Sequence, residues 1–329
     1  MNREPLAHPI TFPVPFMVGS MNLYLIRGEP LTLLDTGPKT NPTREAIKKA
    51  LAAQGSSYKD IKRIIITHGH VDHFGLGREL AQESGAEIYI HPYDASKVRP
   101  GYDFIQEKLS LLKEAGVPEE RLRELEGWTK KAEGFFDPLD EVHPLQENEE
   151  VHFDSFSLKV IHCPGHSQGH ISLYHQTRGD LFGGDHILKD ITPNPAIEPS
   201  PDAPERRSRS LIQYLDSLRK IEDLNPRCVF PTHGPVIDSP RKRIAEIRRH
   251  HLRRKERLHH LLNGQGSTAY ELGHRLFGPS KEMDIYLVVS EVLAHLDLLL
   301  LEERASTQKR DGVIYYTAWG VELKSRRIK

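Results

Sequence analysis

Short apolar runs and polar, amphipathic stretches alternate along the first 240 residues of the chain. The apolar runs are rich in β-branched residues and are bounded by turn-forming residues, which is the pattern of buried strands. They predict strands over residues 22–26, 31–34, 61–66, 87–90, 151–153, 157–162, 170–174, 181–182 and 228–230. Helical patterns cover residues 41–52, where Asn41 is the expected N-cap, 75–84 and 204–224. This alternation indicates an α/β core.

Residues 92–145 interrupt the alternation. Their pattern is helical, charged and broken by Pro and Gly, which predicts an insertion carried on the surface. Long insertions beside sites are usually functional, so we expect this one to act as a lid or a substrate wall. A solvated excursion without a role is the alternative.

The composition changes again after Pro240. A long charged helix is predicted over residues 241–262, a second helix is expected to begin near 267–270, and a third covers 283–301. A strand over 312–318 follows a polar turn. Three helices and a terminal strand pair predict a small winged-helix-like domain. The sequence therefore divides into a core domain over residues 1–240 and a C-terminal domain over 241–329.

Overall composition narrows the protein class but not the ligand. The 329 residues include 37% hydrophobic and 28% charged residues, and the formal net charge is −1. A folded protein is expected, and its global charge favours neither nucleic acid nor membrane. Two cysteines, an N-terminus without a signal-peptide pattern and the lack of a long uncharged apolar stretch together predict a cytoplasmic protein without a membrane span.

Candidate chemistry begins directly after the apolar run 61–66. The next residues read Thr-His-Gly-His-Val-Asp-His, so three imidazoles and one carboxylate fall within six positions. A tight loop at a strand end can direct all of these side chains into one cleft, and the ligand types suit zinc or a similar metal. The ligand candidates in this loop are His68, His70, Asp72 and His73.

Three further ligand types follow apolar runs in the same way. His166 lies in Cys-Pro-Gly-His-Ser, Asp185 in Gly-Gly-Asp, and His233 in Pro-Thr-His-Gly. Rigid strands that carry ligands on the loops beyond their ends are the usual way in which an α/β scaffold builds a site. We therefore expect all seven residues to meet.

The motifs HxHxDH, PGHS, GGD and THG, in this order, resemble those of the metallo-β-lactamase superfamily in its glyoxalase II-like branch. The turn 35–37, Asp-Thr-Gly, also matches that family, and the motifs span about residues 20 to 240. The resemblance implies a four-layer αββα sandwich with two metals at one edge. His68, His70 and His166 would hold the first metal. Asp72, His73 and His233 would hold the second, and Asp185 would bridge both.

The resemblance also implies a mechanism. Two divalent cations about 3.5–4 Å apart generate a hydroxide from a shared water and stabilise the charge that develops on the substrate. Asp72 is the candidate to orient the water or move its proton. Zinc is the expected metal, and iron or manganese fits the same ligands. His170 and His186 are candidates for contacting substrate or supporting the ligands, with packed histidines as the alternative.

The order of core, insertion and C-terminal domain is similar to that of the β-lactamase-like protein 2 group. That group includes thioesterase-like hydrolases and endoribonucleases. We expect a binuclear hydrolase of a small thioester or ester; the alternative is a metal-dependent endoribonuclease that acts on single-stranded RNA. A metal-binding regulator is a third reading, and iron-dependent oxidation also occurs on this fold.

The helical segment 241–257 bears on the choice of partner. It contains nine Lys or Arg and two Glu. This density suits RNA, coenzyme A phosphates or an acidic carrier protein, although a solvated helix face has the same pattern. Acidic residues on the third helix, Glu291 and Asp297 among them, oppose sequence-specific DNA binding. We expect the C-terminal domain to pack on the core, form a homodimer or wall the active site.

Overall fold

The computed structural model describes residues 5–16 and 18–320. The chain forms two compact units. Unit 1 comprises Met1–Tyr102, Ala132–Pro193 and Ser217–Ile244, and unit 2 comprises Asp103–Lys131, Asn194–Asp216 and Ala245–Lys329. These units do not follow the predicted linear division into 1–240 and 241–329, because two internal segments pack with the C-terminal helices.

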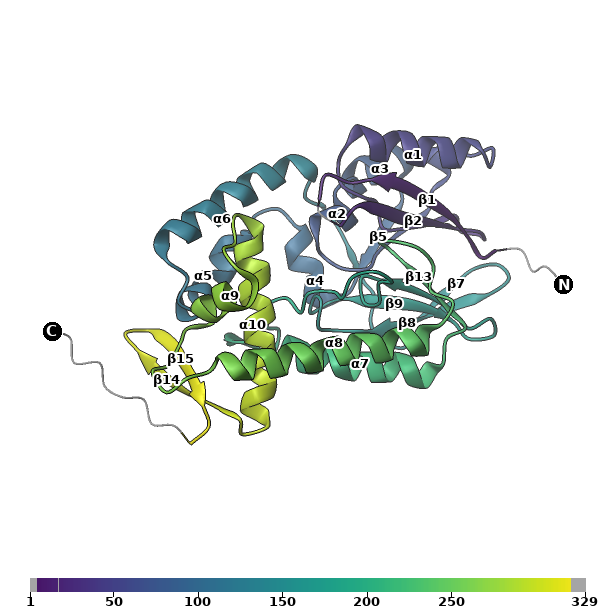
Figure 1. The fold of residues 1–329 in the computed structure, drawn as a ribbon. Coiled ribbons are helices and arrows are strands. Elements are labelled where there is room, and N and C mark those ends of the chain that lie inside the picture. Colours follow the sequence, from purple (N-terminus) through teal and green to yellow (C-terminus); the bar gives the residue numbers. More distant parts are fainter. Residues whose placement is uncertain (1–4, 17, 321–329) are drawn as a thin grey trace. The chain divides into compact units, whose positions relative to one another are not determined.

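Unit 1 contains two sheets, which appear as purple to blue and as teal arrows in Figure 1. The first has the order β1-β2-β3-β4-β5-β6, antiparallel up to β3 and parallel from there to β6. Its strands are β1 Ala7–Pro13, β2 Ser20–Ile26, β3 Thr32–Leu34, β4 Arg63–Ile66, β5 Glu87–Ile90 and β6 His143–Pro144.

The second sheet has the order β13-β10-β9-β8-β7. Only the pair β10 and β13 is parallel. Its strands are β7 Glu150–His152, β8 Ser157–His162, β9 Ile171–His175, β10 Asp180–Gly184 and β13 Cys228–Pro231.

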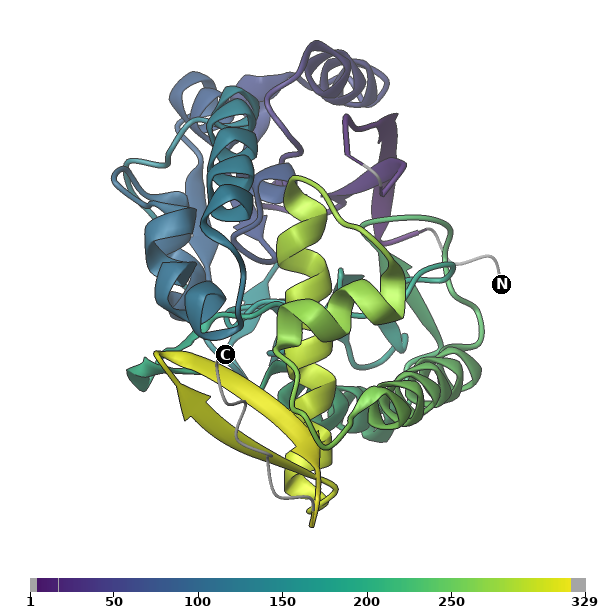
Figure 2. The same ribbon diagram turned by 60° about the vertical axis from the view of Figure 1, so that its left-hand side comes forward.

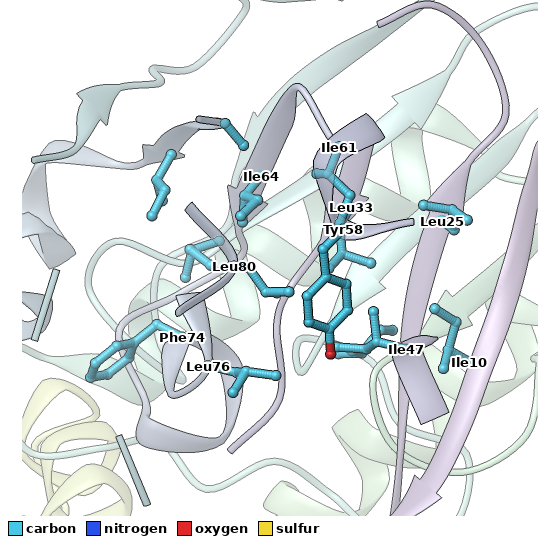
Figure 3. Packing of buried hydrophobic residues seen from close by; sticks show 14 of the residues in the cluster. Ile10, Leu25, Leu33, Ile47, Tyr58, Ile61, Ile64, Phe74, Leu76 and Leu80 are labelled. Atoms are coloured by element: carbon cyan, nitrogen blue, oxygen red, sulfur yellow. The ribbon is translucent and has the colours of Figure 1, made fainter. Parts of the chain in front are cut away.

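Two apolar cores order these sheets into layers. One core lies between the sheets and joins Tyr24 and Ile65 of the first to Leu173 and Phe182 of the second. The other packs the first sheet against helices α1 (Asn41–Ala52) and α3 (Gly77–Ser84), as the labelled side chains of Figure 3 show.

The outer face of the second sheet is covered by a helix. In the C-terminal half of α7 (Ser210–Leu224), the Ser217 hydroxyl donates to the carbonyl of Pro164, and the Leu224 carbonyl accepts from Tyr174. The order helix, sheet, sheet, helix is the αββα arrangement that the resemblance implies.

Most predicted elements of unit 1 are found within a few residues of their expected bounds, and the exceptions have local causes. Helix α1 is capped by Thr40, whose hydroxyl accepts from the N–H of Thr43, and Asn41 is its first residue. The predicted helix 75–84 corresponds to α3, which begins at Gly77, and the short helix α2 (Val71–Phe74) before it was not predicted. Strand β1 was not predicted, because Pro9 and Pro13 weaken a strand pattern; it pairs only with β2, and an edge strand tolerates proline.

Unit 2 is largely helical, and its C-terminal part can be followed in green and yellow in Figure 2. It contains α5 Phe104–Glu114, most of α6 Glu119–Ala132, most of α8 Pro240–Leu261, α9 Ala269–Phe277 and α10 Met283–Leu301. The hairpin of β14 Ala305–Arg310 and β15 Val313–Ala318 follows them, so the predicted order of three helices and a strand pair is confirmed.

The core of unit 2 includes side chains from the middle part of the predicted insertion. Leu112 of α5 and Leu125 of α6 are fully buried with Leu272 of α9 and Val292 of α10. Residues 204–207, predicted as the start of a helix, belong to strand β12 (Ala203–Arg207), which pairs with β11 (Pro199–Ser200). Across the described residues, none of the helices combines the length and apolar character that crossing a membrane requires.

Candidate metal centre

Four loops at strand ends bring the seven predicted ligands together. The loop after β4 carries His68 to His73, and α2 begins directly behind His70, so Asp72 and His73 lie in its first turn. The other three loops follow β8, β10 and β13 and carry one ligand each. The strands fix the loop ends, and the side chains converge from both sheets of unit 1.

The first group is built from three histidines. Nε2 of His68 lies 2.9 Å from Nδ1 of His70, and the ring of His166 lies 4.9 and 4.7 Å from theirs, centroid to centroid. Their ligand atoms are close enough to bind one cation together. This group has the composition that the resemblance implies for the first metal.

The second group combines Asp72, His73 and His233. The Oδ2 atom of Asp72 lies 3.4 Å from Nε2 of His233, and its Oδ1 atom lies 3.8 Å from Nε2 of His73. These three residues also form a group able to hold a cation. Their composition is the one implied for the second metal.

Asp185 lies between the two groups. Its Oδ2 atom is 3.6 Å from Nε2 of His166 in the first group, and 3.6 Å from Nε2 of both His73 and His233 in the second. These separations exceed normal hydrogen-bond lengths. Two ligands of one tetrahedral zinc ion, each bonded at about 2.0–2.1 Å, lie roughly 3.3 Å apart. The spacing therefore resembles that of atoms around a cation more than that of a hydrogen-bonded network.

Unsatisfied polar atoms test whether these residues fit a metal. Within the part of the chain that the structure describes, Nε2 of His73, Nε2 of His233 and Oδ1 of Asp185 are buried and have no hydrogen-bond partner. Buried polar atoms normally have one, and leaving them without a partner is costly. Cations held between the two groups would satisfy all three atoms, so the donor set fits divalent metal.

Comparison with known proteins gives the family. The model of the metallo-β-lactamase superfamily matches residues 17–233. The chain belongs to this superfamily. A probable metallo-hydrolase of Bacillus subtilis, YqjP, is 31% identical over 93% of this chain and 96% of its own length. A β-lactamase-like protein 2 homolog of Caenorhabditis elegans is 30% identical over 75% of this chain and 66% of its own.

A solved structure supports the fold over almost the whole chain. The metallo-β-lactamase family protein TTHA1429 of Thermus thermophilus has a TM-score of 0.82 and 28% identity, covering 95% of this chain and 99% of its own. The superfamily and the named relatives show that the chain is a metal-dependent hydrolase. The resemblance seen in the motifs is thereby confirmed, while the assignment of individual ligands stays a prediction.

The two groups differ in their electrostatics. Burial lowers the pKa of His68 well below its usual range, and it lowers the pKa of His70 to about 3 with help from nearby His166 and Lys97. Burial alone would also lower the pKa of His73, but Asp35 and the two carboxylates of the site raise it well above that range. Asp185 and Asp72 outweigh burial at His233 as well and raise its pKa to about 9, so both histidines of the second group must lose a proton when a cation binds.

Partners outside the ligand set hold the second group in place. The Asp35 carboxylate lies 3.0 Å from Nδ1 of His73 and accepts from the N–H and hydroxyl of Thr67. Nδ1 of His233 lies 3.0 Å from the carbonyl oxygen of Ser20, to which it donates. Fixing Nδ1 in this way directs Nε2 towards the site. From the sequence, Asp35 was noted only as part of a family turn, and its contact with His73 was missed.

His170 and His186 are both buried beside the predicted ligands, and their contacts differ. Nε2 of His170 accepts from the backbone N–H of Asp185 at 3.0 Å. A Cβ atom on Gly184 would lie 2.6 Å from that same Nε2, and Gly184 has a φ of +53°, so this position requires glycine. His186 is fully buried, and burial lowers its pKa to about 3. His170 therefore contacts the backbone of the predicted ligand Asp185, and its supporting role stays a prediction.

Proposed function

We propose that the seven residues hold two divalent cations and that the centre hydrolyses a small thioester or ester. The observation that carries this proposal is the place of Asp185, whose Oδ2 atom is equally far from histidines of both groups. His68, His70 and His166 bind the first cation; Asp72, His73 and His233 bind the second; Asp185 bridges them. Five imidazoles and two carboxylates suit zinc, with iron or manganese as alternatives.

The bound cations supply Lewis acidity, which lowers the pKa of a water molecule and stabilises negative charge on the substrate oxygen. The chain's own residues position that reaction. The pKa of Asp72 falls to about 2, because its histidine neighbours outweigh burial, so its carboxylate stays ionised and can accept a hydrogen bond from water. Asp35 and Ser20 keep His73 and His233 turned towards the site.

Two further relatives favour a thioester. The hydroxyacylglutathione hydrolase GloC of Haemophilus influenzae is 29% identical over 40% of this chain, and an atrochrysone carboxyl ACP thioesterase of Aspergillus aculeatus is 29% identical over 33%. The basic helix offers less support for RNA than its sequence suggests, because Arg254 is paired with Glu291 and Lys255 with Glu302. We therefore propose a small acyl compound as substrate.

The test is thiol release from a panel of acyl-thioesters by zinc-loaded protein, with cation content measured in parallel. Turnover is expected for the wild type and is expected to vanish in Asp72→Ala. Asp140, an exposed aspartate that pairs with Arg78, gives the control variant Asp140→Ala, which should retain wild-type turnover. Protein that binds two cations and cleaves no thioester or ester would contradict the proposed substrate class.

A further inference from the structure

A buried carboxylate outside the ligand set joins two of the ligand loops. Asp94 lies in the short helix α4 (Pro92–Ala95), directly after β5. Its Oδ2 atom accepts from the backbone N–H of Gly69 at 2.8 Å, and its Oδ1 atom accepts from the N–H of Gly169 at 2.9 Å. Gly69 separates His68 from His70, whereas Gly169 belongs to the loop of His166. A single side chain thus holds both loops of the first group.

Two more side chains complete this network. The Ser167 hydroxyl donates to Asp94, and the Lys97 ammonium donates to Oδ1 of Asp94 at 2.7 Å and to the Ser167 hydroxyl at 2.8 Å. Asp94 and Ser167 are fully buried, and Lys97 is 7% exposed. Buried charge is costly unless it is paired and hydrogen-bonded, and here both carboxylate oxygens have two donors each. The network is therefore rigid, and burial is outweighed by Lys97 and the other donors, which lower the pKa of Asp94.

Close packing shows that this arrangement fixes the loops. A Cβ atom on Gly169 would lie 2.6 Å from the backbone nitrogen of Asp94 and 2.7 Å from its Cγ. A Cβ atom on Gly69 would lie 3.0 Å from Cβ of Lys97. Gly169 is needed because its loop approaches Asp94 too closely for a side chain, and a Cβ atom at Gly69 would fit only if Lys97 shifted by a few tenths of an ångström. Each loop is thus set against the same fixed point.

We propose that Asp94 is a positioning residue that sets the distance between the His68–His70 loop and the His166 loop, and thereby preorganises the first cation site alone. The second site is held by other partners, since Asp35 contacts His73 and Ser20 contacts His233. Asp35 contacts the second site directly and reaches the first one only through the Thr67 hydroxyl, which lies 3.2 Å from Nδ1 of His68. This inference rests on the proposed two-cation centre.

The test is the variant Asp94→Asn, titrated with Zn²⁺ in competition with a chromophoric chelator. Asparagine keeps the shape of the side chain but removes its charge. Its amide N–H₂ cannot accept a hydrogen bond, so one of the two loops loses the acceptor for its backbone N–H. Affinity at one of the two sites is expected to fall about 10–100-fold, as for other partners of metal ligands, while the other stays at the wild-type value. With Co²⁺, only the absorption bands of the first site should change.

Two matched variants locate the effect. Asp35→Asn should weaken chiefly the second site, where Asp35 contacts a ligand directly, so the double variant should lose affinity at both. Asp180 is a buried carboxylate at the start of β10 that accepts from Arg178 and Arg227 and touches no ligand loop. Asp180→Asn should leave both affinities unchanged, even if it lowers the melting temperature.

Several outcomes would overturn the proposal. Wild-type affinities in Asp94→Asn, or an equal loss at both sites, would show that Asp94 serves the fold in general. If Asp94→Asn does not fold, the variant Ser167→Ala removes one donor to Asp94 and keeps its ion pair with Lys97. A wild-type Zn²⁺ affinity at the first site of that variant would also contradict the proposal. Wild-type protein that binds fewer than two cations would instead overturn the two-cation centre itself.

Discussion

Each unit of the molecule contains a buried group of histidines and carboxylates close enough to hold a metal. Unit 1 has the seven residues at the strand ends. Unit 2 has His251 of α8 with Glu291 and His295 of α10, all of them buried. Residue type and burial are therefore similar in the two places, and the hydrogen bonds are what separates them.

The unit 2 cluster is largely satisfied by protein donors. Nδ1 of His295 donates to the carbonyl of Glu291 at 2.7 Å, so its Nε2 accepts from Nδ1 of His251 at 3.2 Å. The carboxylate of Glu291 accepts from Arg254 at 2.7 Å and from the side chain of Asn194 at 3.3 Å. Among the described residues of the unit 1 cluster, Nε2 of His73, Nε2 of His233 and Oδ1 of Asp185 are buried without a partner, whereas in the unit 2 cluster this holds for Nε2 of His251 alone. Whether the potential ligand atoms already have hydrogen-bond partners, more than the residue types, therefore distinguishes a structural network from a candidate metal site.

The largest expected effect comes from replacing one carboxylate in each cluster, which tests whether only the unit 1 cluster holds metal. Asp185→Asn should lose bound cation and reduce kcat by about 1,000-fold or more, because several kcal/mol of charge stabilisation depend on the cations. Glu291→Gln should leave cation content and kcat within about twofold of the wild type, because Glu291 belongs to a hydrogen-bonded network and not to the proposed ligand set. Metal analysis and steady-state kinetics measure both. Loss of a cation in Glu291→Gln would show that unit 2 binds metal.

A second prediction uses the protonation of the unit 2 histidines. Burial lowers the pKa of His251 to about 2 and that of His295 to about 4, so both are neutral in the folded protein. An unfolded histidine has a pKa of about 6.5, so below that pH the unfolded state binds more protons and stability falls. At pH 5 the free energy of unfolding should be lower by about 2 kcal/mol for each histidine. This contribution to stability is fully present above about pH 6.5 and is lost as the pH falls.

Fluorescence can follow this loss, because both tryptophans, Trp128 and Trp319, lie in unit 2. The free energy of denaturant unfolding should be lower at pH 5.0 than at pH 7.5 in the wild type and in the control His260→Gln, whose histidine is exposed. This difference between the two pH values should shrink when His251 and His295 are both replaced by Gln. Burial raises the pKa of Glu291, so protonation of Glu291 at low pH stabilises the folded state and opposes the effect of the two histidines. Comparing the double variant with the wild type therefore isolates the contribution of the histidines. An equal acid loss in the double variant would contradict the prediction.

The smallest expected effect concerns support of the metal cluster itself. His170 precedes β9 and accepts from the N–H of Asp185, whereas His175 ends the same strand away from the ligands. His170→Ala should weaken cation binding about tenfold, as loss of a partner behind a ligand usually does. His175→Gln should have no such effect. Calorimetric titration with Zn²⁺ compares them, and equal affinities in the two variants would remove His170 from the support of Asp185.

The sequence was informative wherever a local pattern was enough. The β-branched run before His68 and the Gly- and Pro-rich contexts of His166 and His233 mark strand ends by themselves, so the ligand loops could be predicted. The supporting roles of Asp35 and Asp94 could not, because each depends on contacts with residues far away in the chain. A short motif, His-Pro-Tyr-Asp after β5, was the only local sign of Asp94. The membership of residues 103–131 in unit 2 was equally hidden, since it follows from packing against α9 and α10.

The hydrogen bond between His233 and the Ser20 carbonyl joins residues 213 positions apart. Beside it, Met21 of β2 and His233 in the loop after β13 form an isolated antiparallel β-bridge. Contacts between such distant positions form slowly, because the chain entropy of closing the loop must be overcome first. During synthesis, His68 to His73 emerge long before β13 can dock beside β10. In the proposed centre, we therefore expect capture of a cation by the complete ligand set to be a late event in folding that reports the docking of both sheets.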